Sequence, residues 1–82
     1  MAHVSIMADR ARDLAGGVRE IEIEANTVRR LIAELEKRFP GLGDFVEDHA
    51  AIAIDGEIHQ DALGSPLQPN SEVVLIPRIG GG

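Results

Sequence analysis

The most constraining feature of this 82-residue chain is one amphipathic segment near its middle. Asn26 or Thr27 can serve as the N-cap of a helix there, and Pro40-Gly41 ends it. The helix needs a second layer to cover its apolar face, and a chain of this length has room for one small domain. Apolar side chains recur at helical spacing along that face: Val28, Leu31, Ile32, Leu35 and Phe39.

Several other segments have the pattern of β-strands. Two of them, residues 2–8 and 18–24, alternate between two faces, and Asp55-Gly56 is a strong signal for a tight turn between two others. The predicted strands are residues 2–8, 18–24, 51–54, a short return strand around Ile58, and 72–78.

The remaining segments are interpreted as turns and loops. Residues 9–17 end in the turn signal Gly16-Gly17, and residues 41–50 are expected to form a loop with a short turn that packs Leu42 and Phe45. The segment at 28–39 is therefore the one helix that the pattern predicts.

The strand patterns also predict positions within a sheet. Residues 18–24 place isoleucines on one face and Glu20, Glu22 and Glu24 on the other, as in a half-buried edge strand. Residues 73–76 are apolar on both faces, which is typical of a central strand. An opening hairpin, one helix and a mixed sheet with its first and last strands at the centre form the β-grasp arrangement, so the predicted fold class is α+β.

One helix covers one face of such a sheet and leaves the other face open. An exposed apolar patch there would mark a partner site, although small proteins also expose apolar side chains without function. The alternation leaves two sets open for this face, either Val74 and Ile76 or Val73 and Leu75. We carry Val74 and Ile76 as the working candidates for partner binding.

Composition narrows the classes of function. The net charge is −6, so the chain repels phosphate backbones, and we expect no nucleic-acid partner and a basic protein partner instead. There is no cysteine, which excludes a thiolate nucleophile and favours a reducing compartment. The sequence shows no signal-peptide pattern and no apolar run long enough to span a membrane, so we expect a cytoplasmic protein.

The chain ends in Gly80-Gly81-Gly82, directly after the predicted central strand. We therefore divide the chain into a folded domain, residues 1–78, and a glycine tail, residues 79–82. Fully extended, Ile79 and the glycines reach roughly 13 Å at about 3.3 Å per residue, far enough to enter another protein. Arg78 at the root of the tail can either steer it toward an acidic groove or simply be solvated. The competing interpretation of the tail is a frayed end or a cloning scar.

The sequence resembles the MoaD/ThiS-type ubiquitin-like sulfur carriers over nearly its whole length. The resemblance is carried by the helix and its stop (28–41), by Ala53-Ile54-Asp55-Gly56-Glu57, by the run from Leu67 to Pro77, and by the terminal glycines. Three features differ from the usual family pattern: a third glycine, Pro77-Arg78 in place of Pro-Pro before the tail, and Asn70-Ser71-Glu72 in place of a Gly-Asp turn.

The resemblance implies a function for the tail. An E1-like adenylating enzyme would use ATP and Mg to activate the carboxylate of Gly82, and sulfur would then replace AMP to give a thiocarboxylate. Gly81, Gly80, Ile79 and Arg78 would accompany Gly82 into the partner. A synthase large subunit would accept the sulfur, with molybdopterin as the first choice of product. The chain itself would be a carrier and co-substrate that binds no cofactor, not an enzyme.

Other functions stay open at this stage. The same activation serves a sulfur carrier for thiamine or tRNA thiolation, or a ubiquitin-like modifier joined to a lysine of its target. A β-grasp RNA-binding module is disfavoured by the charge and by the absence of Tyr and Trp. We expect no metal site, because the three histidines (His3, His49 and His59) lack ligand spacing and the glutamates of residues 20–24 suit a solvated strand face.

Overall fold

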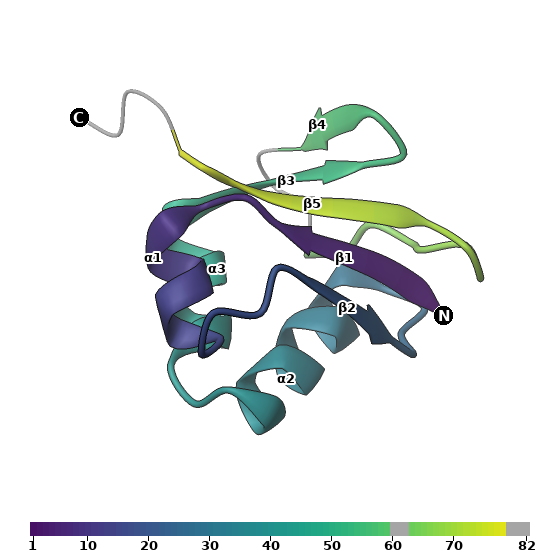
Figure 1. The fold of residues 1–82 in the computed structure, drawn as a ribbon. Helices are drawn as coiled ribbons and strands as arrows, with labels where there is room; N and C mark the ends of the chain where they lie inside the picture. Colours follow the sequence, from purple (N-terminus) through teal and green to yellow (C-terminus); the bar gives the residue numbers. More distant parts are fainter. Residues whose placement is uncertain (60–62, 79–82) are drawn as a thin grey trace.

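A mixed β-sheet with all of its helices on one side forms the fold (Figure 1). The computed structural model describes residues 1–59 and 63–78 of the chain. The elements of these residues are β1 (Ala2–Ile6), α1 (Asp9–Leu14), β2 (Glu20–Ile23), α2 (Val28–Arg38), α3 (Leu42–His49), β3 (Ala50–Ile54), β4 (Glu57–His59) and β5 (Glu72–Pro77).

The strand order is β2-β1-β5-β3-β4. β1 and β5 pair in parallel at the centre, whereas β1–β2, β3–β5 and β3–β4 are antiparallel. The prediction that the first and last strands lie side by side is confirmed, as is the edge position of β2. This is the predicted β-grasp arrangement, an α+β fold.

The core lies between the sheet and the helices. Alternate residues of the central strands, such as Val4, Val73 and Leu75, are completely buried there. The predicted stripe of α2 meets them, and its residues Val28, Leu31 and Leu35 are also completely buried. Burial of each such side chain contributes about 1.5–3 kcal/mol to folding, which makes this layer contact the main source of stability.

Local capping explains the ends of α2. Of the two candidate N-caps, Thr27 is the one used: its Oγ1 accepts a hydrogen bond from the backbone N–H of Arg30 at 3.2 Å. Arg30 lies unfavourably in the first turn with respect to the helix dipole, but its guanidinium pairs with Glu34 at 3.4 Å. The helix ends at Arg38 with Phe39 as its C-cap, directly before Pro40, as predicted.

The Asp55-Gly56 turn is also confirmed. Both residues have positive φ angles, 49° and 89°, as a two-residue hairpin turn between β3 and β4 requires. The Asp55 carboxylate accepts hydrogen bonds from the Glu72 backbone N–H at 2.9 Å and from the Ser71 hydroxyl at 3.1 Å. This turn therefore also anchors the start of β5.

The prediction of a single helix in the chain missed one between the first two strands. Residues 9–14 form α1, and only the glycine turn after it is as predicted, with φ angles of 66° at Gly16 and 90° at Gly17. This helix lacks a side-chain N-cap, so its sequence has no start signal. It forms because small side chains on one face, Ala8, Ala11 and Ala15, are buried in the core.

The prediction of a loop over residues 41–50 is wrong as well. Leu42–His49 is α3, in which Leu42 is buried and Phe45 is half-buried. Its N-cap, Gly41, has a φ of 96° and offers no side chain. The cap comes from α2, where the Glu36 carboxylate accepts hydrogen bonds from the backbone N–H groups of Gly41 at 2.8 Å and Asp44 at 3.2 Å.

This contact has two consequences. The hydrogen bond from Gly41, together with weaker ones from Asp44 and Gly43, lowers the pKa of the Glu36 carboxyl against partial desolvation. The contact between Glu36 and the start of α3 also holds α2 and α3 close together at Gly43. A Cβ at Gly43 would lie 2.7 Å from the Glu36 Cβ and 2.9 Å from the carbonyl oxygen of Ile32.

We expect Gly43→Ala to destabilise the protein by about 1–3 kcal/mol, because the two helices must separate to admit the methyl group. Urea unfolding measures this effect. Gly64→Ala is the matched control, since nothing lies within 4 Å of its added Cβ, and it should change the free energy of unfolding by less than about 0.5 kcal/mol. Equal effects of the two substitutions would contradict the close helix contact.

Candidate functional site

The face of the sheet opposite the helices carries a row of small and apolar side chains. The strand registers align Ser5, Val74, Ala53 and Ile58 across β1, β5, β3 and β4. Ala51 and Ile76 form a second pair beside this row. We call Val74, Ile76, Ala51, Ala53 and Ile58 the apolar patch.

The structure decides which side of β5 faces outward. Val73 and Leu75 are completely buried under the helices, whereas Val74 and Ile76 lie half-buried on the open face. Ile58 at the rim of the apolar patch is 64% exposed. The working candidates Val74 and Ile76 are therefore on the accessible side, and their role in partner binding stays a prediction.

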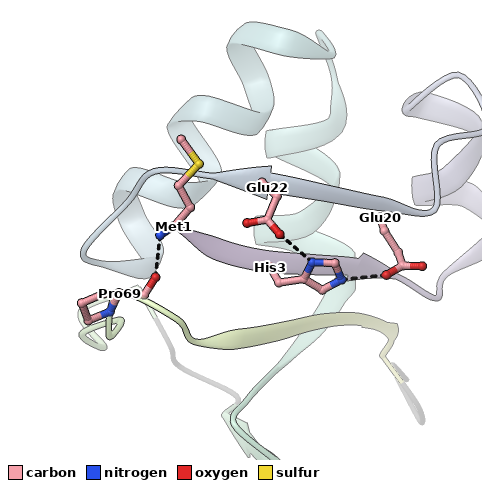
Figure 2. A network of polar contacts seen from close by, with 5 residues as sticks. All are labelled: Met1, His3, Glu20, Glu22 and Pro69. Carbon is pink, nitrogen blue, oxygen red and sulfur yellow. Dashed lines mark hydrogen bonds and ion pairs between the residues drawn. The ribbon is translucent and has the colours of Figure 1, made fainter.

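The other half of the open face is acidic. Glu20 and Glu22 of β2 flank His3 of β1: the imidazole Nε2 lies 2.7 Å from Glu20 and Nδ1 lies 3.0 Å from Glu22 (Figure 2). The register also places Glu72 of β5 beside His3. We call His3, Glu20, Glu22 and Glu72 the acidic rim.

The acidic rim changes the interpretation of two residues. Glu20 and Glu22 are exposed, as expected of a solvated strand face, and they also pair with His3 across the strands. Sequence reasoning missed this contact because it depends on the register of β1 against β2. The hydrogen bond to Glu22, and then that to Glu20, raises the pKa of His3 above 6.5.

The first residue is held as well. The Met1 ammonium group donates to the carbonyl oxygen of Pro69 at 2.6 Å, which ties the start of β1 to the segment before β5 (Figure 2).

Among residues 1–59 and 63–78, no group of three or more His, Asp or Glu side chains is arranged to hold a metal ion. No helix in this part of the chain has the length and apolar character to cross a membrane.

The root of the glycine tail lies at the far end of β5 from Met1 (Figure 1). Arg78 follows the strand directly, and its guanidinium donates to the carbonyl oxygens of Asp48 and Ala50 at 3.2 and 3.4 Å. It is thus bound to the protein's own backbone, which neither sequence interpretation of Arg78 anticipated. The other predicted tail residues, Ile79, Gly80, Gly81 and Gly82, lie outside the described residues, as does the predicted boundary at residue 78/79.

We expect Glu22→Gln to lower the pKa of His3, because it replaces the strongest partner of the protonated imidazole. An NMR titration of the imidazole resonances in wild type and variant measures this. Since the folded-state pKa is raised, the stabilising effect of His3 is fully present below pH 6.5 and is lost as the pH rises through the folded-state value. Glu24→Gln, directly after the end of β2, removes the same charge and is the matched control. An unchanged His3 pKa in Glu22→Gln would contradict the pairing.

Comparisons with known proteins agree on one family. The sequence matches the ThiS family over residues 7–82, which includes the terminal glycines. Comparison with curated protein sequences gives no match.

Among solved structures, a Pyrococcus furiosus protein described as molybdopterin converting factor subunit 1 is 31% identical, with a TM-score of 0.75 and coverage of 95% of this chain and 97% of that one. SAMP1 from Haloferax volcanii is 25% identical, with a TM-score of 0.71 and coverage of 99% and 98%. The Amycolatopsis orientalis BexX/CysO complex contains a chain of the same fold, 19% identical, with a TM-score of 0.83 and full coverage of both chains. The β-grasp domain with its terminal glycines therefore belongs to the ThiS family.

Proposed function

We propose that this chain is a sulfur carrier whose C-terminal carboxylate, on Gly82, is adenylated and then converted to a thiocarboxylate. The observation that carries the proposal is the family match, which runs through the β-grasp domain to Gly82 itself. The central strand β5 leads directly into the glycine tail. A terminal carboxylate next to Gly81 and Gly80 has no neighbouring side chain to obstruct its activation.

The proposed chemistry has two steps. A carboxylate oxygen of Gly82 attacks the α-phosphorus of ATP and displaces pyrophosphate, which gives an acyl adenylate. A sulfide or persulfide sulfur then attacks the acyl carbon and AMP leaves; with a persulfide, a thiol must afterwards reduce the mixed disulfide. The carboxylate needs the first step because its own oxygen is a poor leaving group.

The catalytic groups for these steps come from an E1-like adenylating partner, which also binds ATP and Mg. This chain supplies the reacting carboxylate and the docking surface, so it acts as co-substrate. The apolar patch beside the acidic rim suits a partner with an apolar centre and a basic edge, in line with the net charge of −6. Because the reaction consumes ATP, we place it in the cytoplasm.

Molybdopterin is the proposed product, with a synthase large subunit as the sulfur acceptor. The Pyrococcus protein, at 31% identity, favours this choice. Sulfur transfer for thiamine or tRNA thiolation uses the same thiocarboxylate. The specific alternative is a protein modifier joined to lysine through Gly82, which is favoured by the similarity to SAMP1, a small archaeal modifier protein.

We expect the protein purified from its native host to contain a species heavier by the mass difference between sulfur and oxygen, located at Gly82. Intact mass spectrometry with sequencing of the C-terminal peptide measures this. The control is a chain that lacks all three terminal glycines, Gly80 to Gly82, which should stay unmodified. If Gly82 stays a carboxylate even with ATP, sulfide and the host adenylating enzyme, the sulfur-carrier proposal is wrong. A mass that shows Gly82 in an amide bond with a lysine would establish the modifier alternative.

We expect Val74→Glu to reduce kcat/KM for adenylation by more than about tenfold, since it puts a charge at the centre of an apolar contact. Pyrophosphate exchange with the host adenylating enzyme measures this. Ala33→Glu on the exposed face of α2 adds the same charge in the helix layer and should change kcat/KM by less than about twofold. Equal activity of the two variants would exclude the apolar patch as the docking surface.

A further inference from the structure

The side chain of Arg78, directly after β5, contacts the backbone where α3 meets β3. Three successive carbonyl oxygens, of Asp48, His49 and Ala50, accept hydrogen bonds from Arg78. The guanidinium donates through one Nη atom to Asp48 at 3.2 Å and through the other to Ala50 at 3.4 Å, and the backbone N–H donates to His49 at 3.4 Å. We call this set of contacts the Arg78 clasp.

The acceptors lie where backbone partners are scarce. α3 ends at His49, and the last carbonyl groups of a helix have no partner within the helix. A cation is favoured at this negative end of the helix dipole. Arg78 therefore supplies hydrogen-bond donors to the carbonyl groups at the junction between α3 and β3, and its positive charge suits the end of the helix.

Arg78 also lies directly after β5, where the β3–β5 ladder ends. Pro77 pairs with Ala50 at the end of the β3–β5 ladder. The next backbone donor is the N–H of Arg78. Without the guanidinium, a single long hydrogen bond would hold the chain at the point where it leaves the sheet.

We propose that Arg78 is a positioning residue: by closing on the α3–β3 junction, it sets the direction in which the chain leaves β5 toward the partner's active site. This inference rests on the proposed function, because the tail must reach a nucleotide for direction to matter. The requirement is geometric, so lysine cannot replace arginine. An ammonium group acts as a point donor, whereas the planar guanidinium spans two acceptors at once.

The first test uses the protein alone and compares Arg78→Ala, Arg78→Lys and the control Arg38→Ala. Arg38 lies in the last turn of α2, and its substitution makes the same change of charge as Arg78→Ala. Carbonyl ¹³C resonances of Asp48 and Ala50 should shift in both Arg78 variants and stay in place in the control. Unfolding midpoints in urea verify that all variants are folded. Unshifted carbonyl resonances in Arg78→Ala would overturn the clasp, whether or not the protein is a sulfur carrier.

The second test measures pyrophosphate exchange with the host adenylating enzyme. A misdirected tail lowers kcat about tenfold in Arg78→Ala and Arg78→Lys, with KM within about twofold of wild type, since small misplacements of reacting groups are costly. A raised KM with unchanged kcat would show that Arg78 contacts the partner instead. A wild-type kcat in Arg78→Lys would show that only the positive charge at this position matters. Either result overturns the positioning role. Absence of exchange in wild type would instead count against the proposed function.

Discussion

The parallel pairing of β1 with β5 is the constraint on which the rest of the structure depends. It places the first and last strands side by side at the centre of the sheet and aligns Val4 with Val73. That register turns Val73 and Leu75 toward the helices and Val74 and Ile76 toward the open face. Because a parallel pair needs a long crossover, the helices of the intervening segment all pack on one side (Figure 1). The open face follows from this one pairing.

A second principle of the fold is that α3 is held at both ends by side chains from other elements. Glu36 of α2 accepts hydrogen bonds from its N-terminal amides, and Arg78 donates to carbonyls at its C-terminal end. Each side chain matches the sign of the helix dipole at its end. The short helix is thereby coupled to the exit of the chain from β5. The position of Arg78, at the root of the tail, is thereby fixed relative to α3.

In the proposed function, the open face binds the partner and the tail supplies the reacting carboxylate. The apolar patch lies on β3, β4 and β5, while the acidic rim lies on β1, β2 and the start of β5. A partner that meets both halves is oriented as well as bound, because charge fixes the register of an apolar contact. Arg78, from which the glycine tail continues, lies at the end of β5 opposite the acidic rim.

The sequence by itself determined the features that depend on local patterns: the α2 stripe with its cap and stop, the strands, the Asp55-Gly56 turn, the edge and centre positions of β2 and β5, and the glycine terminus. These are encoded in neighbouring residues through helical or strand periodicity and turn chemistry. Tertiary structure alone decided the existence of α1 and α3, the outward side of β5, the pairing of His3 with Glu20 and Glu22, and the position of the Arg78 guanidinium. The reason is that each of these depends on contacts outside its own segment, such as Asp48 for the Arg78 guanidinium or β2 for His3. Such partners meet only once the sheet register is set.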